Sequence, residues 1–173
     1  MALLNHNSRE EIDQHHFHPA VMILVPLLAI FLQAYLPLRF PRIAVLDLPL
    51  IVTVYFAVSR RNPITGMLQG TTIGLLQDAL THLPLGINGI IKAVIGYLSA
   101  SIGMRIDVEN PGTRIIMLFV FTLLDSVMHL FIVRRLLGLQ QDWYWLHELI
   151  RAVVNALIGI IVFTVLDRTR QRE

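Results

Sequence analysis

The chain has 173 residues, no cysteine and a formal net charge of +2. Hydrophobic residues make up 55% of it, and the mean hydropathy of +0.64 exceeds what a soluble core of this size can bury. The lack of cysteine excludes disulfides, thiolate metal sites and cysteine nucleophiles. This composition predicts a multispanning membrane protein that contacts lipid, and nothing in the charge balance indicates nucleic-acid binding.

The first 18 residues form a polar head. Its acidic residues Glu10, Glu11 and Asp13 outnumber Arg9, so the head lacks the basic flank of a secretory signal, and we expect it to stay attached. A solvated tail beside the membrane is the expected structure, and a loose metal site at its histidines is the alternative. These histidines are His6, His15, His16 and His18.

Six apolar segments of about 17 to 21 residues follow, each long enough to cross about 30 Å of hydrocarbon. The second is the weakest, because Asp47 and Pro49 shorten its apolar run, and a re-entrant or tilted segment is the alternative there. Since the connections are short, the sequence predicts an all-α membrane protein, with a six-helix transmembrane domain at 19–166 and a basic tail at 167–173. The segments cover residues 19–36, 43–59, 64–81, 85–104, 113–133 and 146–166.

Arginines in the loops and tails indicate the orientation of this bundle. Eight lie on the side of the termini and four on the other, when the intrahelical Lys92 and Arg151 are left out. Both termini are therefore predicted to be cytoplasmic, with the aromatic residues 143–145 at the outer interface. The larger group is Arg9, Arg60, Arg61, Arg105, Arg114, Arg168, Arg170 and Arg172; the smaller is Arg39, Arg42, Arg134 and Arg135.

Small residues form a stripe on each of the third and fourth segments, at spacings that place them on one helix face. Such stripes let membrane helices approach closely, either within the bundle or against a partner helix. We expect the outer parts of the two stripes to meet, which leaves the region around Gly66 and Gly70 as a docking surface. The stripes contain Gly66, Gly70 and Gly74 on the third segment, and Gly89, Gly96, Ser99 and Gly103 on the fourth.

Ionisable residues inside the predicted helices need partners, because each costs about 2.5 to 3.5 kcal/mol if it faces lipid at the helix centre. Asp78 ends the third stripe and Lys92 lies on the fourth, so we predict an ion pair between them, with Asn88 as a hydrogen-bond partner. Structural pairing is favoured over a proton relay, which would need further acidic residues.

A second polar group is predicted between the fifth and sixth segments. Asp125 pairs with Arg151, and His129, Glu148 and Asn155 are their neighbours. One histidine and one carboxylate at this spacing are too few ligands for a metal site. Both groups fall in the outer half of the bundle, where they could line a shallow polar cavity.

Familiar catalytic signatures are missing from the sequence. His147-Glu148 does not extend to HExxH, no serine lies in GxSxG, and there is no phosphate-binding glycine loop. We therefore expect no enzyme activity and no cofactor.

Two consecutive stretches resemble the MreD family of rod shape-determining proteins. They are DLPLIVTVYFAVSRRNP at 47–63 and GMLQGTTIGLLQDALTHLPLGINGIIKAVIGYLSASIG at 66–103. The resemblance implies a non-enzymatic scaffold in the bacterial inner membrane that links MreC, a bitopic protein, and the peptidoglycan synthases RodA and a class B penicillin-binding protein to the MreB cytoskeleton. It gives no active site, so matching positions such as Asp47 and Pro84 are expected to serve the fold and its contacts.

The resemblance also implies a fold like that of the substrate-binding membrane subunits of energy-coupling-factor transporters. The alternative function is therefore a vitamin-binding subunit, which would need an outer pocket between residues 81–88 and the aromatic residues at 143–145. Its coupling partner would also require a small-residue stripe that the first segment lacks. A channel is disfavoured, because the inner half has no intramembrane charge.

Overall fold

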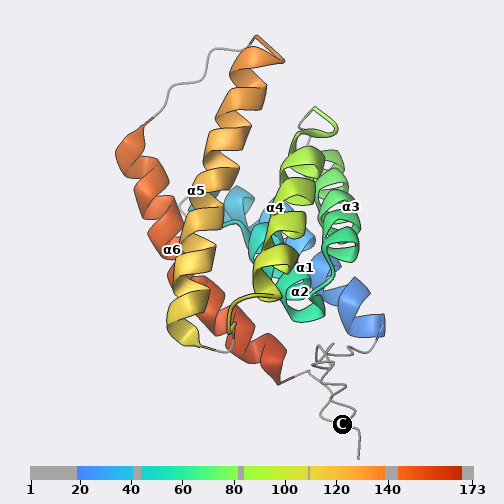
Figure 1. Cartoon of the computed structure of the whole chain (residues 1–173). Helices are drawn as coiled ribbons and strands as arrows, with labels where there is room; N and C mark the ends of the chain where they lie inside the picture. Colours follow the sequence, from blue (N-terminus) through green and yellow to red (C-terminus); the bar gives the residue numbers. More distant parts are fainter. Residues whose placement is uncertain (1–18, 41–43, 82–83, 109, 139–143, 169–173) are drawn as a thin grey trace, which may run out of the picture.

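The computed structural model describes residues 19–40, 44–81, 84–108, 110–138 and 144–168, which contain six α-helices (Figure 1). Three of them, α1, α5 and α6, are long and apolar enough to cross a membrane. The predicted histidine-rich head lies outside the described residues, as do Arg42, Trp143 and the tail beyond Arg168. The helices are α1 (Pro19–Arg39), α2 (Leu48–Arg60), α3 (Pro63–Thr81), α4 (Ile87–Gly103), α5 (Pro111–Arg135) and α6 (Trp145–Asp167).

The second predicted segment is wrong in length, because α2 begins at Leu48 and has 13 residues. At 1.5 Å per residue it is about 20 Å long, too short to cross the hydrocarbon core. Its start is fixed by Asp47, whose carboxylate accepts a hydrogen bond from the Leu50 N–H, and by Pro49 in the first turn. The residues that precede Asp47 therefore do not continue the helix.

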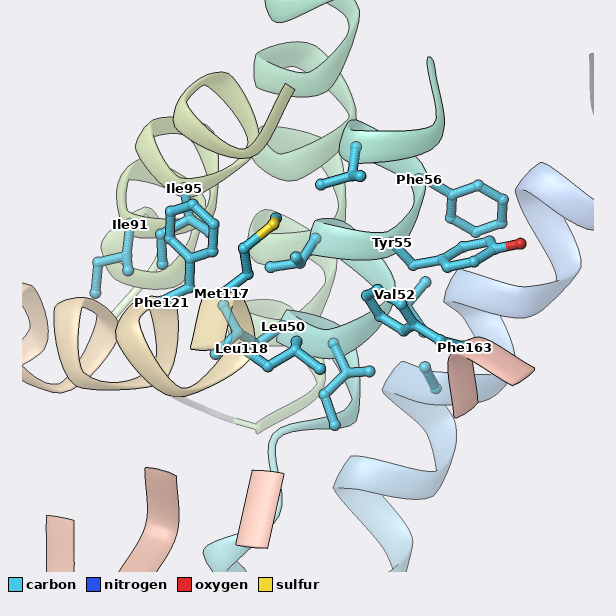
Figure 2. Close-up of a cluster of buried hydrophobic side chains, with 14 of the residues drawn as sticks. Leu50, Val52, Tyr55, Phe56, Ile91, Ile95, Met117, Leu118, Phe121 and Phe163 are labelled. Carbon is cyan, nitrogen blue, oxygen red and sulfur yellow. The ribbon is translucent and has the colours of Figure 1, made fainter. Parts of the chain in front are cut away.

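Helix α2 lies at the centre of the bundle, where it contacts all five other helices. Eleven of its residues are buried, in one run from Pro49 to Ser59. Figure 2 shows its side chains meeting Ile91 and Ile95 of α4, Phe121 of α5 and Phe163 of α6. A helix that is apolar on all sides must be covered by lipid or by other helices, and because α2 is too short to cross the hydrocarbon core, the other helices cover it.

Helices α3 and α4 form a tight antiparallel hairpin in which their glycines face each other (Figure 1). A Cβ atom on Gly66 would lie 2.6 Å from the Gly96 carbonyl oxygen, and Cβ atoms on Gly70 and Gly74 would collide with the carbonyl oxygens of Lys92 and Asn88. The three glycines of α3 thus pack against the α4 backbone. The docking surface expected around Gly66 and Gly70 is wrong, because α4 covers it.

The rest of the α4 stripe also meets neighbours within the bundle. A Cβ atom on Gly89 would lie 2.9 Å from the tip of Leu75 on α3, and one on Gly103 would lie 2.9 Å from the Val58 carbonyl oxygen of α2. Ser99 is fully buried. The six glycines of the two stripes therefore serve packing between α2, α3 and α4.

Helices α5 and α6 form a second antiparallel hairpin that packs on α2 and α4. The Leu118 side chain of α5 packs against Gly159 of α6, in space that a Cβ atom would occupy. At the end where α6 finishes, Arg114 Nη1 lies 2.6 Å from Asp167 Oδ2, and the Tyr55 hydroxyl donates to the other oxygen of that carboxylate at 3.1 Å. This polar contact connects α5 and α6 to the central helix.

Candidate functional site

The candidate site begins at the backbone break before α2. The Asp47 N–H donates to Asn155 Oδ1 at 2.8 Å, and Asn155 Nδ2 donates to the Val45 carbonyl at 3.2 Å. Because buried backbone groups need partners, this asparagine satisfies the peptide groups that the short α2 leaves unpaired. Asn155, predicted as a neighbour of Arg151, thus fixes the start of α2 against α6.

Lys92 is fully buried and points from α4 toward α2 and α5. Its ammonium lies 3.4 Å from Asp47 Oδ2 and 3.8 Å from Asp125 Oδ1, and it also donates to Asn88 Oδ1 at 3.4 Å. The predicted ion pair between Lys92 and Asp78 is therefore wrong. Lys92 pairs instead with Asp125 of α5 and with Asp47, which caps the start of α2.

Asp78 has its own partners, which explains the difference. Its carboxylate accepts from the Gly86 N–H at 2.9 Å, from the Asn88 N–H at 3.1 Å and from Asn88 Nδ2 at 2.7 Å. Gly86 has φ +104°, a conformation that favours glycine and turns these donors toward Asp78. A carboxylate at a helix N-terminus is stabilised by the free N–H groups there, so Asp78 needs no cation.

Arg151 of α6 joins the same cluster from the opposite side. Its Nη2 atom lies 3.0 Å from Asp125 Oδ2, the pairing that the sequence indicates, and 3.2 Å from Asp47 Oδ2. Its Nη1 atom donates to Ser126 at 3.1 Å and lies 3.7 Å from Glu148. Helices α4, α5 and α6 and the start of α2 therefore meet at one charged cluster.

Asp47 is the residue of this cluster that the sequence reasoning missed as a partner. In the sequence Asp47 interrupts an apolar run, and the family resemblance implies a general role in the fold and its contacts without naming a partner. The signal in the sequence is the free-energy cost of placing a carboxylate in an apolar segment, because such a group needs a cation or hydrogen-bond donors. Asp47 meets that need with both Lys92 and Arg151, while its other oxygen caps α2.

A cavity of about 200 Å³ adjoins the charged cluster, and most of its lining is polar. His129 lies here and is half-buried, one helical turn from Asp125. Within the described ranges, no group of three or more His, Cys, Asp or Glu residues is arranged to hold a metal ion. The titratable or amide side chains that line the cavity include Asp47, Gln77, Asp125, His129, Glu148 and Arg151.

The charges in the cluster nearly balance. Three carboxylates, from Asp47, Asp125 and Glu148, face the two cations Lys92 and Arg151. Such an arrangement can hold four chain segments in register, because removing either cation leaves buried carboxylates uncompensated. It offers hydrogen-bonding groups to a small polar molecule.

Comparison with known proteins identifies the family. The family model of the rod shape-determining protein MreD matches residues 15–168. Searches of the curated proteins and of the solved structures gave no significant match. The match includes both glycine-faced helices and the whole charged cluster, so the chain belongs to the MreD family of rod shape-determining proteins.

Proposed function

We propose that this chain is a non-enzymatic scaffold of the cell-elongation machinery in the bacterial inner membrane, which links MreC and the peptidoglycan synthases to the MreB cytoskeleton. The observation that carries the proposal is the family match over residues 15–168. The structure supports it chemically, because Lys92 and Arg151 are both held by carboxylates of neighbouring helices. Ion pairs between helices hold the bundle in one arrangement, as a protein that positions its partners requires.

The proposed orientation places both termini in the cytoplasm. In Figure 1 the end of α6, the end of α4 and the start of α5 lie at one end of the bundle, and the end of α3, the start of α4 and the end of α5 lie at the other. The described arginines at the first end are Arg60, Arg61, Arg105, Arg114 and Arg168, and those at the second end are Arg39, Arg134 and Arg135. The excess of arginine at the end where α6 finishes supports this orientation.

The MreC helix needs a docking surface other than the glycine stripes. A groove of about 410 Å³ between α1 and α3 is lined mainly by apolar side chains, including Leu27 and Leu68. Gln69 also lines it, and neither atom of its amide has a hydrogen-bond partner among the residues described. Polar side chains that bond across helices contribute to association in membranes, so we assign this groove to the single helix of MreC.

Co-purification of MreC with the full chain from native membranes tests both points. The native chain should retain MreC, and Gln69→Met should retain less because it removes the amide from the groove. Gln77→Met is the matched control, since it makes the same change two turns later on the same helix, away from the groove. Absence of MreC from the native preparation would refute the scaffold, and equal retention by both variants would refute the groove.

The vitamin-transporter alternative gains no support from the cavity beside the charged cluster. No Trp, Tyr or Phe is part of its lining within the described ranges, although stacking on a vitamin ring would use such residues. The predicted wall at Trp143 lies outside the residues described.

A further inference from the structure

Two hydrogen-bond acceptors in the polar cavity have no donor. Gln77 is 7% exposed and Asp125 is 2% exposed, yet Gln77 Oε1 and Asp125 Oδ1 accept no hydrogen bond from any residue that the structure describes. The cation nearest to Asp125 Oδ1, the Lys92 ammonium, is 3.8 Å away, beyond hydrogen-bond distance. Both residues line the cavity. Buried acceptors are nearly always hydrogen-bonded, so these two oxygens indicate that a molecule bound in the cavity supplies donors to them.

The charge of the cluster indicates what kind of donor is missing. Three carboxylates against two cations leave one excess negative charge. Asp47 and Asp125 each contact both cations, whereas Glu148 contacts only Arg151, so the excess lies with Glu148, which lines the cavity. A positively charged donor would both complete the hydrogen bonds and balance the charge.

We propose that this cavity binds the primary ammonium group of a small ligand. An ammonium group carries one positive charge and three N–H donors, which match Gln77 Oε1, Asp125 Oδ1 and the Glu148 carboxylate. A cavity of about 200 Å³ has room for such a group with a short polar chain, since a water molecule occupies about 30 Å³. The group can belong to a free amine or to the headgroup of an aminophospholipid.

Other occupants match the cavity less well. Water supplies donors but leaves the excess charge, and a quaternary ammonium group supplies charge without an N–H donor. A divalent metal ion would need more protein ligands than the described residues bring together. The inference goes beyond the scaffold role and does not depend on it.

The test is calorimetric titration of the purified full chain, in a neutral detergent, with ethanolamine. Choline has the same charge but no N–H group, and ethylene glycol has no charge. We expect ethanolamine alone to bind. Gln77→Met should weaken binding by about ten-fold or more, because a hydrogen bond to a charged group is lost. Glu148→Gln, which removes the excess charge and keeps an acceptor, should weaken it similarly.

Gln69→Met is the matched control, since it removes an equivalent buried amide from the α1–α3 groove and should leave ethanolamine binding unchanged. Vesicles of phosphatidylglycerol, with or without phosphatidylethanolamine, distinguish the two sources of amine. If phosphatidylethanolamine in the vesicles abolishes ethanolamine binding, the lipid headgroup is the natural ligand. If ethanolamine binds in both kinds of vesicle, the ligand is a free amine.

Three results would overturn the inference. They are no ethanolamine binding in detergent or in phosphatidylglycerol vesicles, equal binding of choline, and unchanged binding in both Gln77→Met and Glu148→Gln. Circular dichroism of each variant establishes that it is folded. If Gln77→Met does not fold, the less buried Glu148 gives the decisive variant. MreC co-purification is measured separately, so failure of this inference and failure of the scaffold proposal are distinct outcomes.

Discussion

Replacing Lys92 by methionine removes the ammonium group from the centre of the charged cluster while keeping most of the side-chain volume. The ammonium lies 3.4 Å from Asp47 and 3.8 Å from Asp125 and is fully buried. At an effective dielectric constant of about 20, these distances correspond to attractions of about 5 and about 4 kcal/mol. Desolvation of the ammonium offsets much of this, so we expect a net loss of about 3 to 5 kcal/mol in the free energy of unfolding.

A double-mutant cycle measures the coupling energy between Lys92 and each carboxylate, and so identifies its ion-pair partner. Asp47→Asn keeps an acceptor that can cap α2 and removes the charge beside Lys92. The Asp47→Asn and Lys92→Met double variant should therefore be more stable than the sum of the single losses implies, by about 1.5 to 3 kcal/mol. Asp78→Asn with Lys92→Met should show less than about 1 kcal/mol of coupling, because only Asn88 connects the two side chains.

The measurement is reversible unfolding of the full chain in mixed micelles with increasing dodecyl sulfate, followed by far-ultraviolet circular dichroism. All variants are compared at one lipid composition and one pH. A coupling energy larger for Asp78 than for Asp47 would refute the pairing described here and would restore the ion pair expected from the sequence.

Three further predictions concern packing, capping and the second polar contact. Gly70→Ala should destabilise the fold by about 1 to 3 kcal/mol despite better helix propensity, because its Cβ would collide with the Lys92 backbone. Gly89→Ala, whose Cβ comes closest to the Leu75 side chain, which can move, should cost clearly less in the same unfolding assay. Asp78→Ala should cost about 2 to 4 kcal/mol because several donors at the start of α4 lose their acceptor, and Asp78→Asn should cost less; equal losses would contradict the capping role. Arg114→Lys should lose about 1 kcal/mol, since an ammonium cannot replace both the Nε bond to the Val108 carbonyl and the Nη1 pair with Asp167, and an unchanged midpoint would argue against this contact.

The helices themselves could be predicted from the sequence because apolar runs and their breaks are local. Helices α3 to α6 begin and end within about three residues of the predicted segments. The glycine spacing likewise indicated close packing, although the partner of each stripe was not a local property. Only the structure places Gly70 against the Lys92 backbone.

The pairing of the charges could not be predicted as well, because it depends on contacts between residues far apart in the chain. Asp47 meets Arg151 across 104 positions. The Asp78 carboxylate is satisfied by the backbone N–H groups of Gly86 and Asn88 together with the Asn88 side-chain amide, and the backbone donors cannot be found by matching side chains. Asp125 and Arg151 were paired successfully because the fifth and sixth segments form a hairpin. Because every carboxylate in an apolar segment needs a partner, the sequence does indicate that Asp47 has one, although not which.

The scaffold role is tested most directly by the ratio of cell length to cell width after depletion of this protein from a rod-shaped host. Expression of the native chain should restore rods, and its loss should give round cells while the amount of RodA in the membrane stays unchanged. Cells that remain rod-shaped after complete depletion would contradict the account.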